Sequence, residues 1–101
     1  MSRITKSKAK NFLGDVPEEH VFYFSDGNQA RNLEDLQNTL VRMNDDTFNY
    51  HSNIEKSDFS NWVKDVVGDE ELAQKLRKAK DRSRALTAVS DRVAFLKKNT
   101  Q

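Results

Sequence analysis

Residues 51–76 constrain the fold of this chain more than any other segment, because they predict two helices with almost no connection between them. Four apolar residues recur at i, i+3, i+4 and i+7, the spacing of one helix face: Phe59, Trp62, Val63 and Val66. Gly68 predicts the end of this helix, since glycine adopts positive φ at little cost. The acidic run 69–71 then favours a second helix start. We expect the apolar faces of the two helices to meet around Trp62.

Length and composition limit the chain to one small domain. Its 101 residues leave room for a single modest core. No apolar run approaches the ~20 residues that span a bilayer, so we expect no membrane partner. Cysteine is absent, which excludes disulfides and cysteine-type zinc sites and suits a cytoplasmic protein. We predict a loose basic tail over residues 1–14, one helical domain over residues 15–98 and a frayed end over residues 99–101.

Turn chemistry and helical spacing predict the elements before and after the central segment. The β-prone run 21–24 precedes an Asp-Gly turn, so residues 29–31 are the expected returning strand of a hairpin. A helix is expected from Asn32 to Met43, and a short one follows it. For residues 70–98 we prefer two helices with a break near 80–83, because the second half of one long helix would have little to pack against. The predicted fold is mainly α (small α+β), a compact helical domain with one short N-terminal β-hairpin.

The order of these residues resembles a known signature. The pattern reads F-x-F-x-D-G, then H-x6-D-F-x-x-W, then G-D-x-x-L-A, over about residues 17–93. It resembles an uncharacterised, largely archaeal prokaryotic family of unknown function, and residues 1–16 fall outside the likeness. The resemblance implies a compact small domain and no established activity. Its positions here are His51, Asp58, Phe59, Trp62 and Gly68.

His51 and Asp58 are the natural catalytic candidates, because a histidine beside a carboxylate can act as a general base. The sequence offers no clear nucleophile and no glycine-rich oxyanion loop to accompany them. We therefore favour a structural role, in which His51 bonds a backbone group or caps the central helix through Asp58. His20 is the only other histidine, and no spacing typical of a metal site is present. We predict no catalytic residue, no metal site and no cofactor.

The adjacent aromatics 22–24 allow two interpretations. They can form a platform on which nucleic-acid bases stack, or they can pack in the core. Neighbouring strand residues face opposite sides, so at least one of the three must be internal. We favour core packing and regard Tyr23 as the residue to test for exposure.

Charge is distributed unevenly along the chain, and its basic C-terminal part is the best candidate binding surface. The residues concerned are Lys75, Arg77, Lys78, Lys80, Arg82 and Arg84. Clustered cations can bind phosphates, but they can also form a solvated helix face that pairs with the acidic middle of the chain. The leading hypothesis is a small non-catalytic interaction or accessory module that binds another protein. The alternative is a nucleic-acid- or ribosome-associated protein that uses its basic tail and basic C-terminal helix.

Overall fold

Each α-helix within residues 4–101, the part of the chain that the structure describes, begins at a short polar residue whose side chain accepts a backbone N–H. These N-caps satisfy amides that have no helical partner. Within those residues, the α-helices of the computed structural model are α1 (Lys6–Leu13), α2 (Leu33–Arg42), α3 (Asp45–His51), α4 (Asp58–Trp62), α5 (Glu70–Lys78) and α6 (Arg82–Lys98). Their caps, in the same order, are Thr5, Asn32, Asn44, Ser57, Asp69 and Asp81.

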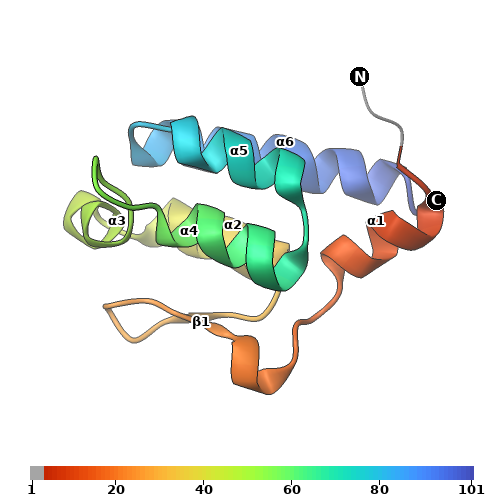
Figure 1. Cartoon of the computed structure of the whole chain (residues 1–101), viewed down its shortest axis with the longest axis horizontal. Coiled ribbons are helices and arrows are strands. Elements are labelled where there is room, and N and C mark those ends of the chain that lie inside the picture. Colours follow the sequence, from red (N-terminus) through yellow and green to blue (C-terminus); the bar gives the residue numbers. More distant parts are fainter. Residues whose placement is uncertain (1–3) are drawn as a thin grey trace.

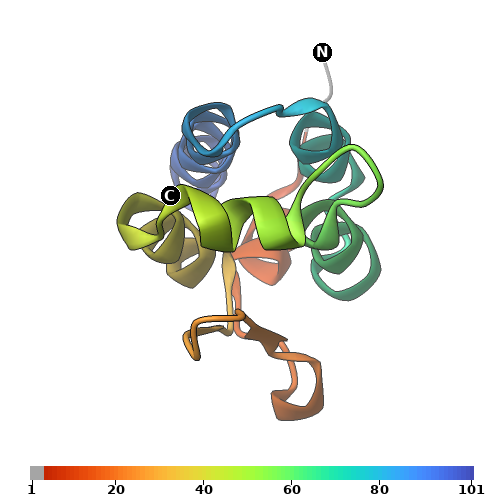
Figure 2. The same ribbon diagram turned by 90° about the vertical axis from the view of Figure 1, so that its left-hand side faces the viewer.

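Four of the helices run side by side, and the others close the two ends of that group. Figure 1 shows α5 and α6 above α4 and α2, with α1 at one end. Figure 2 looks onto the opposite end, which α3 crosses. The hairpin lies below the helices in both views. The fold is therefore mainly α with one small antiparallel sheet, as predicted.

The hairpin consists of β1 (Phe22–Tyr23) and β2 (Gln29–Ala30), with Phe22 opposite Ala30. Its turn contains Gly27, whose φ of 93° explains the Asp-Gly signal in the sequence. Phe22 and Phe24 are buried, whereas Tyr23 is exposed. The preference for core packing is confirmed for the two phenylalanines, and alternation along the strand explains the exposed tyrosine.

The core lies between the helices and the hairpin. Aromatic rings fill its lower part, where Phe59 stacks on Phe22 at 5.4 Å and on Phe48 at 5.6 Å between ring centroids. Leucines and valines from α2, α5 and α6 fill the rest of the core. A two-stranded hairpin is marginal alone in water, and burial of its phenylalanines against α4 stabilises it here.

The central helix ends at Gly68 as its sequence predicts, but its last turn is π-helical instead of α-helical. After Trp62 the chain continues as a π-helical segment, η2 (Val63–Val67). Gly68 then adopts a φ of 91°, and its N–H bonds the Val63 carbonyl at 2.7 Å. The next helix starts at Glu70, and a second break before Asp81 separates α5 from α6. The preference for two helices over residues 70–98 is confirmed.

The loose tail predicted for residues 1–14 is wrong over most of its length. Residues 6–13 form α1, which packs against α6. Ala9 is completely buried, and Phe12 and Leu13 are half-buried beside it. The sequence of this segment shows no apolar stripe, because only a few side chains of this two-turn helix face the core. Residues 1–3 lie outside the described part of the chain. None of the helices in residues 4–101 has the length and apolarity needed to cross a membrane.

Candidate functional site

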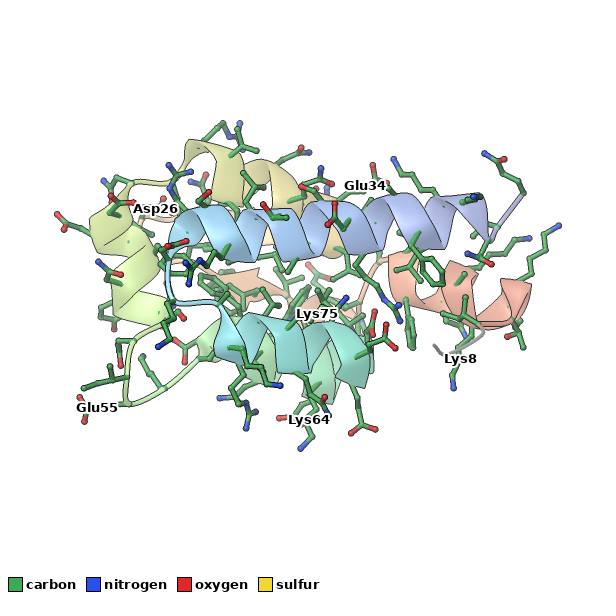
Figure 3. The ribbon with its side chains drawn as sticks, turned by 90° about the horizontal axis from the view of Figure 1, so that it is seen from above. Lys8, Asp26, Glu34, Glu55, Lys64 and Lys75 are labelled. Carbon is green, nitrogen blue, oxygen red and sulfur yellow. The ribbon has the colours of Figure 1, made fainter. Side chains whose placement is uncertain are left out.

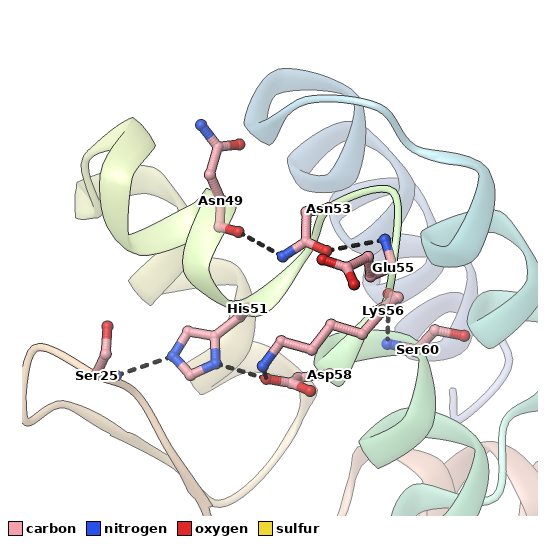
Figure 4. A network of polar contacts seen from close by, with 9 residues as sticks. Ser25, Asn49, His51, Asn53, Glu55, Lys56, Asp58 and Ser60 are labelled. Atoms are coloured by element: carbon pink, nitrogen blue, oxygen red, sulfur yellow. Dashed lines mark hydrogen bonds and ion pairs between the residues drawn. The ribbon is translucent and has the colours of Figure 1, made fainter.

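The imidazole of His51 lies at the centre of a polar network that joins the hairpin turn, α3 and α4 (Figure 4). Its Nε2 accepts the backbone N–H of Ser25 at 2.9 Å. Its Nδ1 lies 3.0 Å from the Asp58 carboxylate, and the ammonium of Lys56 donates to the same oxygen at 3.1 Å. The hairpin turn, 26 residues away in the sequence, is therefore joined to α3 and α4 through one side chain.

These contacts fix the tautomer of His51. A backbone N–H can only donate, so Nε2 must accept and the ring proton must lie on Nδ1, directed at Asp58. The side chain is 5% exposed and has the rings of Phe22, Phe24 and Phe59 around it. Both ring nitrogens are thus engaged within the protein. The backbone bond that the sequence interpretation favoured is present, although Ser57 and not Asp58 caps α4.

Trp62 is buried on the side of α4 that faces the hairpin. Its indole Nε1 donates to the His20 carbonyl at 2.8 Å, and its ring meets Phe22 edge-on at 5.9 Å. The side chain therefore joins α4 to the segment before the hairpin, a role beyond the helix–helix packing that the sequence predicts. Ser60 is the α4 side chain that hydrogen-bonds α5, donating to the Ala73 carbonyl at 2.6 Å.

The six predicted basic residues do not form one free surface. Arg82 donates to the Leu40 carbonyl at 2.9 Å and so satisfies the end of α2. Arg84 pairs with Asp81 at 3.8 Å, and Arg77 reaches the hydroxyl of Ser60 at 3.5 Å. Within residues 4–101 the other three have no side-chain partner; they are Lys75, Lys78 and Lys80. Arg82 is therefore tied to the end of α2, whereas the three lysines, Arg77 and Arg84 lie at the surface grooves described below.

The basic residues of α1 lie far from those of α5. Figure 3 shows Lys8 at the α1 end of the molecule and Lys75 over α5, on the side towards α6. The α5–α6 connection lies at the opposite end of the molecule from α1 (Figure 1). The predicted tail and the predicted basic helix consequently form separate patches.

A groove of about 590 Å³ lies between the α3–α4 loop and the end of α5, and we call it the Ile54 groove. Its lining consists of Asn49, Ser52, Asn53, Ile54, Arg77, Lys78, Ala79 and Lys80. A smaller hollow of about 330 Å³ adjoins it and shares Asn53, Ile54 and Arg77. Ile54 itself is 103% exposed. The sequence analysis assigned no site to residues 52–56, where the only signal was one isoleucine among polar neighbours.

A second groove of about 370 Å³ lies on the outer side of α5 and α6. Lys75, Lys78 and Arg84 line it together with Asp91 and several small residues. Lys78 therefore belongs to both grooves. Within residues 4–101, no group of three or more histidine, cysteine, aspartate or glutamate side chains is arranged to hold a metal ion.

Comparisons with known proteins place the chain in no group. No protein-family model, no curated protein and no solved structure matches it. Membership in the family of unknown function that the sequence resembles stays a prediction.

Proposed function

We propose that this protein is a small non-catalytic interaction module that binds another protein through the Ile54 groove. The observation that carries the proposal is the full exposure of Ile54 beside a groove. Burial of this aliphatic side chain against a partner would remove apolar surface from water, which is a favourable term in protein association. The absence of cysteine suits a reducing compartment such as the cytoplasm.

The loop that carries Ile54 is held in place by its own hydrogen bonds. The Asn53 N–H bonds the Lys56 carbonyl at 2.9 Å, and the Asn53 side chain accepts from Glu55 and donates to Asn49. An isolated antiparallel bridge between Ser52 and Ser57 closes the base of the loop. A loop that is already ordered loses little conformational freedom on binding, which favours affinity.

Site-specific photocrosslinking in cells tests this proposal. A photoreactive phenylalanine analogue at position 54 is expected to give defined protein adducts that survive nuclease and diminish when unlabelled wild-type protein is added in excess. The matched control is the same analogue at Val41, an exposed apolar residue of α2 that is 56% accessible. Identical adduct patterns from the two positions, or no adduct at position 54, would contradict the proposal.

Nucleic-acid binding is the second candidate, and the three lysines without partners favour it. Lys75, Lys78 and Lys80 extend along the end of α5, and cations that neutralise phosphates release counterions. A gel-shift titration with single-stranded RNA should then show a complex whose affinity falls steeply as salt increases. Absence of a complex at low salt, or equal binding by K75Q/K78Q/K80Q, would exclude this candidate.

A further inference from the structure

We infer that the segment which occupies the Ile54 groove is an acidic stretch of a partner protein with one apolar side chain at its centre. This inference rests on the proposed function and names the chemistry of the partner. It follows from the charges that line the groove, from the apolar side chains in its lining and from the kinds of side chain that its lining lacks.

The lining of the Ile54 groove is cationic and contains no carboxylate. Arg77, Lys78 and Lys80 contribute its charges, and the two lysines have no side-chain partner within residues 4–101. Like charges gathered on one concave surface repel each other, and an anionic occupant relieves that repulsion and is steered to the groove. Carboxylates of a partner segment are therefore the complementary groups.

Ile54 and Ala79 supply the apolar part of the same groove. An aliphatic side chain seated between them removes apolar surface from water on both partners, which is the largest favourable term in most associations. A phosphate backbone has no group that would use this contact. No aromatic side chain lines the groove either, so it offers no platform for stacking bases. The apolar part of the lining thus favours an acidic peptide over a nucleic acid.

The size of the groove fits a short segment. A volume of about 590 Å³ lies within the roughly 300–1,000 Å³ range of ligand pockets in proteins. The adjoining hollow shares Asn53, Ile54 and Arg77 with the groove and adds Glu55, Lys56, Ser57 and Asn61, so the one carboxylate of the two linings lies there beside a lysine. A partner that crosses the loop at Ile54 would therefore place its acidic residues over the α5 side, away from Glu55.

The test uses the full chain and three blocked peptides in a nuclear magnetic resonance titration. The probes are Glu-Glu-Leu-Glu-Glu, the same peptide with glycine in place of leucine, and Lys-Lys-Leu-Lys-Lys. The acidic leucine peptide is expected to shift the amides of residues 52–54 and 77–80 and to bind about tenfold more tightly than the glycine peptide. The lysine peptide should leave these amides unchanged.

Matched variants separate the groove from general charge attraction. K78E/K80E should lose binding of the acidic leucine peptide, whereas Lys98→Glu on the last turn of α6 should keep it. The inference is overturned if the glycine peptide binds equally well, if the lysine peptide binds, or if no shift appears at millimolar peptide. Equal loss in the two variants would also overturn it.

Failure of this inference can be told apart from failure of the proposed function. Mass spectrometry of the adduct formed at position 54 identifies the partner segment. A neutral or basic segment there would refute the acidic occupant and leave the interaction module intact. The absence of any adduct would refute both.

Discussion

The guanidinium of Arg92 in α6 holds the carboxylate of Asp69 with two hydrogen bonds, from Nε at 2.7 Å and from the terminal amine at 3.0 Å. Asp69 is 1% exposed and also caps α5 by accepting the Leu72 N–H at 3.1 Å. Arg92 reaches Glu71 at 3.1 Å and lies over the ring of Phe95. One buried pair therefore fixes the start of α5 to the middle of α6, directly after the Gly68 turn.

Replacing Arg92 with methionine should lower the free energy of unfolding by about 3–5 kcal/mol, because it leaves a buried carboxylate without its counter-charge. Urea denaturation followed by circular dichroism measures the change. The exposed pair between Arg84 and Asp81 is the control, since Arg84→Met should cost less than about 1 kcal/mol. An equal decrease in the free energy of unfolding in the two variants would show that the buried Asp69 pair contributes no more to stability than the exposed pair.

Substitutions of Trp62 test how much its packing and its hydrogen bond contribute to stability. Trp62→Ala should cost about 3–5 kcal/mol through loss of buried area and the cavity it leaves. Trp62→Phe keeps a ring against Phe22 but removes the indole bond to the His20 carbonyl, so a smaller loss of about 1–3 kcal/mol is expected. Circular dichroism in urea reports both variants without needing the tryptophan signal. An unchanged unfolding curve for Trp62→Ala would place the core elsewhere.

His51 should act as a structural tie to the hairpin turn. His51→Ala leaves the Ser25 N–H without its acceptor, and we expect a loss of about 1–3 kcal/mol with faster hydrogen exchange at Ser25. His20→Ala is the control, because that side chain is exposed. Nitrogen nuclear magnetic resonance of the neutral ring should place the proton on Nδ1. A proton found on Nε2 would contradict the hydrogen-bond pattern.

Gly68 and Gly14 should respond oppositely to alanine. Gly68 has a φ of 91°, a conformation that costs a residue with a Cβ about 1–2 kcal/mol. An added Cβ would meet only Phe12 at 3.8 Å, so the backbone and not a clash sets the loss. Gly14 has a φ of −73°, and Gly14→Ala should be neutral or slightly stabilising. Thermal unfolding of both variants decides the point, and equal melting temperatures would contradict it.

Local signals in the sequence predicted most of the fold. The Gly68 stop, the acidic helix start at residues 69–71 and the Asp-Gly turn each depend on a few neighbouring residues, so they can be recognised without a structure. The break before Asp81 was expected for a different reason, because the second half of one long helix would have had little to pack against. Mainly helical architecture with one hairpin follows from these signals.

Interactions between segments that are far apart in the sequence could not be predicted from it. Arg92 lies 23 residues from Asp69, and nothing in the spacing marks them as partners. His51 accepts a hydrogen bond from a backbone amide 26 residues earlier. Every residue type except proline has such an amide, so the sequence does not indicate which one is the partner. The Ile54 groove likewise depends on a loop folding back beside the end of α5. The candidate site therefore became visible only in three dimensions.

The α1 helix is the part of the fold that the sequence mispredicted, and Ala9 tests its contribution. Ala9 is completely buried where α1 packs against α6. Ala9→Asp should destabilise the protein by several kcal/mol, because it places a charge and extra volume in a closed contact. Ser7→Asp on the exposed side of the same helix is the control, and it should change stability by less than about 0.5 kcal/mol. Urea denaturation distinguishes the two, and a harmless Ala9→Asp would mean that the N-terminal segment is as loose as its sequence suggests.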